Sequence, residues 1–277
     1  MALRDILVHA DQSPHFEKRF RIALKLAKNQ KSELTGLFSQ ANAFMESRTS
    51  GLEKRRKQHE AASVALCERV TPEAEAAGVK LNWITAPFDR EEEKVTDQVI
   101  FYAQHFDMII VGQHDESVHD GSIPADLAEC LVLESGRPIL IIPYAGKFEH
   151  VGKRAIVAWN TGRESVRALN DAIPLIRDAK RVKVVAINPR RKGKRHGVVP
   201  SADIVQHLVR HGLKAEADHF ATDGVDEGNL LLNIASDERA DLLVMGAYGH
   251  HRFRELVLGG VTREILDHMT LPVLMSH

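Results

Sequence analysis

The sequence of 277 residues has little cysteine, few aromatic residues and no long apolar run. Its two cysteines, Cys67 and Cys130, are too few for a disulfide framework, which predicts a reducing compartment. No apolar run reaches the roughly 18 residues that a membrane span needs. The start of the chain contains an acid, Asp5, where a signal peptide would be apolar. We therefore expect a cytoplasmic protein that does not bind a membrane.

Charge and motif content exclude several classes of function. The 37 basic and 38 acidic residues nearly cancel, which gives no general reason to expect nucleic acid as a partner. The basic run at residues 189–196 lacks the interleaved aromatics of a base-stacking platform, so we interpret it as a solvated loop. The patterns C-x-x-C, H-E-x-x-H, G-x-S-x-G and G-x-x-x-x-G-K-[ST] are absent, which points away from a metal site, a serine hydrolase and a Walker-type nucleotidase.

The stretch from Asp241 to Thr262 carries the clearest functional pattern. Its apolar residues 242–245 are typical of a strand that is buried on both faces. Two glycine pairs follow, the second just before a segment with helical spacing: Gly246 with Gly249, and Gly259 with Gly260. Bare backbone N–H groups at a strand end and at a helix start favour an anion, above all a phosphate chain. The alternative is that these glycines only close turns and cap a helix.

An internal repeat divides the chain into two similar halves. Three pairs of strand-like runs match: residues 107–112 with 241–246, 137–142 with 271–276, and 6–11 with 155–160. The first two pairs are 134 residues apart and the third is 149 apart, so the first half holds 15 extra residues, which we place in its charged segment. A repeat in register predicts a duplicated domain. We expect one domain at residues 1–146 and a second at 147–277.

Strands and helices alternate in both halves. Strands are expected near residues 4–9, 33–38, 80–85, 107–111 and 138–143, and again near 154–159, 181–187, 213–219, 241–245 and 272–276. Helices are expected near 13–29, 51–77, 92–105 and 124–135, and near 163–178, 200–211, 225–238 and 260–269. This alternation predicts right-handed crossovers and a parallel sheet in each half, which is the α/β class.

The glycine pattern and the repeat together resemble the universal stress protein family. Members that bind ATP carry G-x-x-G, nine residues, then Gly and Ser or Thr; Gly246, Gly249 and Gly259 match, and Gly260 stands in place of the hydroxyl residue. The chain resembles a tandem member with two domains in one polypeptide. The resemblance implies two Rossmann-like domains of the adenine nucleotide α-hydrolase type, each with a five-stranded parallel sheet. It further implies a pseudo-dimer of the two domains through their last strands, and it leaves a homodimer open.

The resemblance also implies which residues of the second half would hold a nucleotide. The set comprises residues at strand ends, in the glycine loop and at the last helix start: Asn160, Ile187, Met245, Gly246, Tyr248, Gly249, Arg252, Gly259, Gly260 and Val261. Asn160 would bond the adenosine part with its amide, Ile187 would touch the base, and Arg252 would add charge beside the phosphates. The ordinary readings also stay open: a turn residue for Asn160, a core residue for Ile187 and a solvated loop for Arg252.

The first half carries a degenerate version of the pattern. At a separation of 134 residues, Asp115 replaces Gly249, Ala125 replaces Gly259 and Asp126 replaces Gly260. Acids at these positions repel phosphate, so we predict that this half does not hold ATP. Asp11 keeps the acid that the family has at the end of its first strand, which leaves a nucleoside without phosphates open.

The sequence therefore predicts a universal stress protein that binds ATP or AMP in its second half and acts as a sensor or regulatory protein. Mg²⁺ as a companion of ATP is left open. No general base or nucleophile is placed at the site, so any ATP hydrolysis should be slow. The alternative is an interaction scaffold of the same fold, without a nucleotide. Either reading involves a protein partner that the sequence does not identify.

Overall fold

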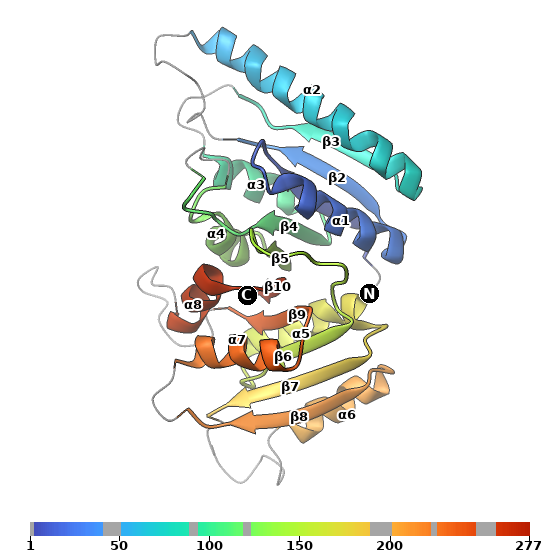
Figure 1. Ribbon diagram of the computed structural model, residues 1–277, viewed down its shortest axis with the longest axis vertical. Helices are drawn as coiled ribbons and strands as arrows, with labels where there is room; N and C mark the ends of the chain where they lie inside the picture. The colour runs from blue at the N-terminus through green and yellow to red at the C-terminus, as the bar shows by residue number, and fades with distance from the viewer. Residues whose placement is uncertain are drawn as a thin grey trace. The chain divides into compact units, whose positions relative to one another are not determined.

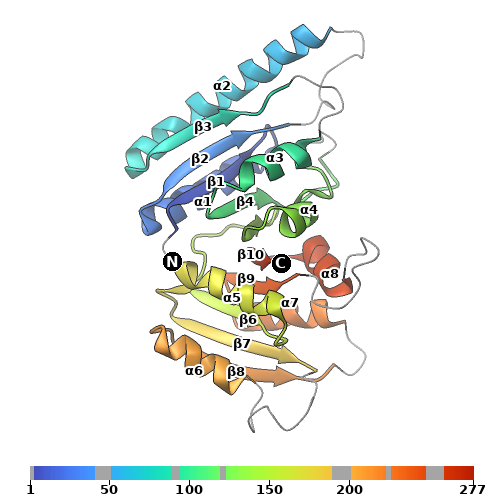
Figure 2. The same cartoon turned by 180° about the vertical axis from the view of Figure 1, so that it is seen from behind.

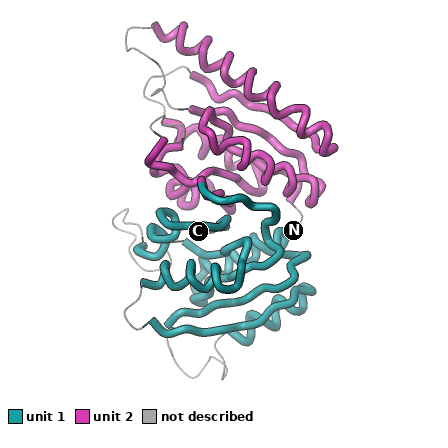
Figure 3. Tube along the Cα trace, in the orientation of Figure 1, with its two compact units in different colours: residues 1, 145–277 teal, residues 2–144 magenta. Residues whose placement is uncertain are grey.

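The computed structural model describes residues 3–40, 51–88, 94–118, 123–188, 201–222, 226–247 and 259–277, and the structural statements below concern these residues. The chain forms two compact units that divide between Tyr144 and Ala145, which we call the N-terminal and C-terminal units (Figure 3). Tyr248, Gly249 and Arg252 of the predicted site lie outside the described residues, and so does the basic run.

The N-terminal unit is a five-stranded parallel sheet with helices between its strands. The strands are β1 (Asp5–Ala10), β2 (Glu33–Phe38), β3 (Leu81–Thr85), β4 (Met108–Gly112) and β5 (Ile139–Ile142). The helices are α1 (Phe16–Gln30), α2 (Leu52–Ala77), α3 (Val95–Ala103) and α4 (Leu127–Glu134). The strands lie in the order β3-β2-β1-β4-β5. This order reverses between β1 and β4, which is where an open α/β sheet binds ligands.

The C-terminal unit repeats this arrangement. Its strands are β6 (Arg154–Ala158), β7 (Arg181–Ile187), β8 (Ala215–Phe220), β9 (Leu242–Gly246) and β10 (Val273–Ser276). Its helices are α5 (Arg163–Ile176), α6 (Ala202–Arg210), α7 (Glu227–Asp237) and α8 (Gly260–His268). The order is β8-β7-β6-β9-β10, so β6 and β9 flank the reversal as β1 and β4 do in the other unit. The predicted fold class is confirmed, with a parallel sheet in each unit.

Helices cover both faces of each sheet (Figures 1 and 2). In the N-terminal unit α1 and α2 lie on one face and α3 and α4 on the other; in the C-terminal unit α5 and α6 lie opposite α7 and α8. The strands next to each reversal are apolar runs because helices pack on both of their faces. All five residues of β4, for example, are buried.

The additional residues of the first half lengthen α2. This helix has 26 residues, whereas α6 at the same place in the repeat has nine. Its buried residues follow one face at helical spacing: His59, Ser63, Leu66, Val70 and Ala74. No helix among the described residues is both long and apolar enough to cross a membrane.

Candidate functional site

The carboxyl ends of β6 and β9 place two predicted site residues at one edge of the sheet. Val157 pairs with Val244 in the parallel register of these strands. Asn160 follows β6 and Gly246 ends β9, so both lie beyond this pair on the side where the strand order reverses. Sequence positions 86 residues apart are therefore brought together at the switch point, as the repeat led us to expect.

Asn160 is exposed and closes a turn with one end of its amide. Its Oδ1 accepts a hydrogen bond of 2.8 Å from the backbone N–H of Gly162, two residues further along. This is the Asx turn that precedes many helices, and it leads into α5. The Nδ2 group takes no part in this bond, so its two donors remain available at this exposed residue.

Gly246 makes room for a helix. A Cβ atom on this residue would overlap the backbone of Glu164 and Ser165 in the first turn of α5. The absent side chain thus lets α5 approach the end of β9, which is a packing role that the sequence pattern could not distinguish from ligand contact. The neighbouring Met245 is 4% exposed and belongs to the core. Ile187 is the last residue of β7, at the carboxyl end of the strand, and is half-buried.

The start of α8 offers unpaired backbone donors. Gly259 is the N-cap residue and no side chain caps the helix. Gly259 and Gly260 are exposed, and a Cβ on Gly260 would meet nothing within 4 Å among the described residues beyond its own helix turn. Val261 is half-buried and follows directly in the first turn. Three predicted site residues therefore form one open helix N-terminus.

Glu164 is a residue of this edge that our sequence analysis missed. Its side chain is 11% exposed, and its Oε1 accepts a 2.8 Å hydrogen bond from Nε of Arg163. Burial alone would raise the pKa of the carboxyl, but its own backbone N–H, Arg163 and His277 outweigh burial and hold the pKa below its ordinary value. Glu164 therefore carries a negative charge at the start of α5. Because this charge repels an anion, an anion at this edge would bind at the start of α8 instead. The sequence feature that could have pointed to Glu164 is its position two residues after the turn residue Gly162.

The same edge of the N-terminal unit is filled by its own side chains. Asp11 is fully buried; its Oδ2 accepts a 2.5 Å bond from Arg19 Nη2 and its Oδ1 accepts one of 2.8 Å from the N–H of Ser13. Burial would raise the pKa of Asp11, but Arg19 and His9 outweigh it and keep the pKa below its ordinary value. Nε of Arg19 also donates to the carbonyl of His9 at 3.0 Å. Asp11 is thus already paired within the protein.

Acidic side chains surround the remaining part of that edge. Asp115 accepts a 2.9 Å hydrogen bond from Nε2 of His15, which ties the loop after β4 to the start of α1. Asp126 is the N-cap residue of α4, and Glu129 lies in the first turn. These positions are the ones that carry glycine and Arg263 in the C-terminal unit, so the two units differ in charge at these positions.

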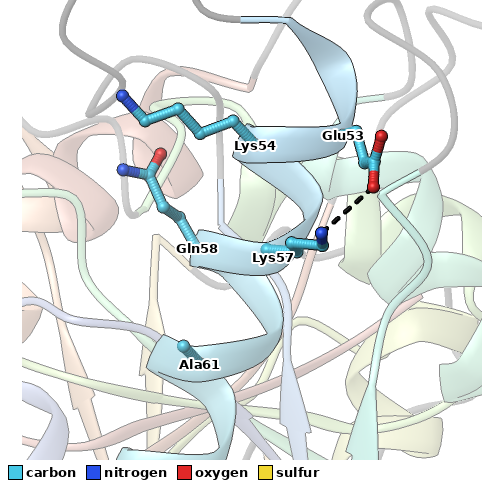
Figure 4. Close-up of a pocket in the computed structure, with 5 residues that line it drawn as sticks. All are labelled: Glu53, Lys54, Lys57, Gln58 and Ala61. Atoms are coloured by element: carbon cyan, nitrogen blue, oxygen red, sulfur yellow. Dashed lines mark ion pairs between the residues drawn. The ribbon is translucent and has the colours of Figure 1, made fainter.

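A hollow on α2 lacks the features of a binding site. The hollow in Figure 4 is lined by Glu53, Lys54, Lys57, Gln58 and Ala61. All of them come from the exposed face of α2, and the Lys57–Glu53 ion pair of 3.1 Å is an ordinary helix-surface contact. The described residues contain no group of three or more His, Cys, Asp or Glu side chains that could hold a metal ion.

Known proteins share this fold. The universal stress protein family matches residues 153–277. A universal stress protein from Archaeoglobus fulgidus DSM 4304 has a TM-score of 0.73, with 16% identity, over 98% of this chain and 97% of its own. A functionally unknown protein from Pseudomonas aeruginosa PAO1 has a TM-score of 0.61 at 16% identity over 99% of this chain and 92% of its own.

A universal stress protein of Synechocystis sp. is 43% identical over 44 residues, a segment that spans 16% of this chain and 15% of that relative. Each unit is thus an α/β domain of the Rossmann-like class. Residues 153–277 belong to the universal stress protein family, and the whole chain has the fold of its structural relatives, which confirms the resemblance to a tandem member.

Proposed function

We propose that the C-terminal unit binds an adenine nucleotide, ATP or AMP, and that the protein acts as a regulatory or sensor protein of the stress response. One observation carries the proposal. Each of the helices α1 to α7 has an acidic residue in its first turn, whereas α8 has none. Among the described helices, α8 alone leaves the positive end of its dipole without a negative side chain.

A phosphate group would supply the missing negative charge. An acid near a helix N-terminus contributes about 0.3–1 kcal/mol, and its absence leaves that stabilisation to be supplied by a ligand. The two glycines at the start of α8 keep side chains away from the first-turn N–H groups, so phosphate oxygens can approach them closely. Arg263 in the same turn adds positive charge where the N-terminal unit has Glu129.

The nucleoside would lie along the strand ends next to α8. Asn160 offers the free donors of its amide, and Ile187 offers apolar surface for a base. Tyr248, Gly249 and Arg252 stay candidate residues of the loop between β9 and α8. Met245 would support the site from the core, and the packing of Gly246 against α5 would set the position of the strand end.

We expect one nucleotide per chain. In the N-terminal unit the buried Asp11–Arg19 pair occupies the switch point, and Asp115 and Asp126 bring negative charge to the places a phosphate would need. Repulsion at close range is worth on the order of 1 kcal/mol or more per charge pair. The predicted inability of this unit to hold ATP therefore stays part of the proposal.

Thermal unfolding with ATP, AMP and buffer alone tests the proposal. A ligand that binds only the folded state stabilises it by about 2.7 kcal/mol at one hundred times its Kd, so a clear rise in Tm is expected. Titration calorimetry should give a stoichiometry near one. Mass spectrometry of the denatured protein should find co-purified adenine nucleotide. A Tm that stays unchanged at millimolar ATP and AMP contradicts the proposal.

A scaffold without a ligand is the second candidate, and two observations favour it. Asn160 already closes a turn, and Gly246 is already accounted for by the packing of α5. A scaffold would bind its protein partner equally well with and without ATP. A nucleotide sensor would change that binding, because a ligand shifts an equilibrium by its differential affinity for the two states. The partner, the pseudo-dimer of the two domains and the homodimer stay predictions.

A further inference from the structure

Asn188, just beyond β7, has an unusual backbone conformation. Its φ is 45°, in the left-handed region that most side chains avoid. Asn tolerates this region because its short amide can bond locally. A strained residue at the carboxyl edge of an α/β sheet is a typical feature of a ligand site, where the surrounding bonds hold the strain in place.

Four hydrogen bonds hold Asn188 in this conformation. Its Nδ2 donates to Oγ1 of Thr222 at 2.6 Å and to Oε1 of Glu227 at 3.1 Å. Its Oδ1 accepts from the N–H of Thr222 at 3.0 Å, and its own N–H donates to the carbonyl of Phe220 at 2.9 Å. One exposed side chain therefore ties the end of β7 to the end of β8 and to the first residue of α7.

Among the described residues of the N-terminal unit, no such network forms at the same place. The sheet registers pair Val8 with Gly36 in one unit and Val157 with Val184 in the other, which makes Gln40 the counterpart of Asn188. The Oε1 of Gln40 accepts a 3.2 Å hydrogen bond from the N–H of Gln12. The fold can therefore end this strand without a left-handed residue, and the network is a feature of the unit that we propose to bind a nucleotide.

We propose that Asn188 is a positioning residue for the base of the nucleotide. The inference rests on the proposed function and adds to it. By fixing the backbone that directly follows Ile187, the network fixes the last residue of β7, whose half-buried side chain is the one we propose to contact the base. The residue acts on the base alone, because the phosphates are assigned to α8, on the other side of β6 from β7.

Two ligands separate this role from a general loss of structure. Tripolyphosphate carries the phosphate chain of ATP but no base. In Asn188→Ala the amide is lost and the left-handed backbone becomes unfavourable, so Ile187 is no longer held for the base and the affinity for ATP should fall about tenfold. The affinity for tripolyphosphate should stay within about twofold of the wild type. Titration calorimetry measures both.

Asn188→Gly serves as the second variant, because glycine keeps the backbone conformation without strain and removes only the side-chain bonds. It should fold even if Asn188→Ala does not. It should also bind ATP more weakly than the wild type while its affinity for tripolyphosphate stays the same. Equal loss for ATP and tripolyphosphate in the folded variant, or no loss for either, overturns the positioning role while the proposed function stands. A wild-type protein that binds neither ligand overturns both.

Discussion

Asp11 and Asn160 occupy equivalent positions in the two units and form the same turn. Each side-chain Oδ1 accepts a 2.8 Å hydrogen bond from the N–H two residues further on. Asp11 is then buried against Arg19, whereas Asn160 is exposed. The residue that corresponds to Arg19 at a separation of 149 residues is Ala168. The acid and its basic partner, Asp11 and Arg19, are thus both replaced by uncharged residues in the C-terminal unit. This pair decides whether the end of the first strand is filled by side chains.

The helices after the fourth strands differ in the same sense. The start of α4 carries Asp126 and Glu129, and the equivalent positions at α8 carry Gly260 and Arg263. Backbone geometry is conserved between the units, while the charge at one edge is inverted. Both copies of the domain therefore keep the same sheet. The C-terminal unit has an open edge with glycine and arginine at these positions, whereas side chains of the N-terminal unit fill its own edge.

The largest effect is expected for Arg19→Ala, which removes the partner of a fully buried carboxylate. Asp11 would remain charged without compensation, and breaking a buried pair in this way costs about 3–5 kcal/mol. Urea unfolding of the full chain measures the loss. The double variant Asp11→Asn/Arg19→Ala copies Asn160 and Ala168 and should recover part of it, since no unpaired charge remains. A double variant less stable than the single one contradicts this account.

His9 should make stability depend on pH in the N-terminal unit. Burial lowers its pKa from 6.5 to about 4, although Asp11 opposes the effect, and its Nε2 donates to the carbonyl of Ser39 at 2.8 Å. Because the unfolded chain takes up a proton at a higher pH than the folded one, this contribution is present above pH 6.5 and is lost as pH falls toward 4. At roughly 1.4 kcal/mol per pH unit, the loss is about 3 kcal/mol.

Urea unfolding at several pH values between 6.5 and 4 measures this slope. His59 is also buried with a lowered pKa and contributes a slope of the same sign. The test is therefore the difference between the wild type and His9→Ala, which copies Ala158 of the other unit. Equal slopes in the two proteins would show that His9 is not the titrating group.

Two matched glycine variants compare the packing of the first helix of each unit. In Gly246→Ala the new methyl group would overlap the backbone of α5, which cannot move without shifting the helix, so we expect a loss of about 1–3 kcal/mol. In Gly112→Ala it would meet the ends of Arg19 and Ile123, which can adjust. Thermal unfolding should therefore rank Gly246→Ala as the more damaging change. The reverse order would mean that the guanidinium of Arg19 is held more rigidly than the helix.

The sequence was sufficient for the fold because apolar runs and helical periods alternate clearly in both halves. It also located the open start of α8, since glycine has only a few structural uses. It did not reveal that Arg19 closes the N-terminal edge, because a cation eight residues after Asp11 looks like an ordinary exposed helix residue until α1 packs on the sheet. The packing role of Gly246 and the network of Asn188 depend on segments far apart in the sequence, so they too required coordinates.

The smallest change in stability, and the clearest change in function, is expected for Gly260→Asp. This variant gives α8 the acid that Asp126 gives α4, and its Cβ would meet no neighbour within 4 Å among the described residues beyond its own helix turn. The free protein should become more stable by about 0.3–1 kcal/mol, because the acid balances the helix dipole. The rise in Tm with ATP should disappear, because the carboxylate occupies and repels the phosphate position. Gly260→Ser is the matched control: it restores a hydroxyl without charge and should keep the ATP response. A Gly260→Asp protein that is still stabilised by ATP would place the phosphates away from α8.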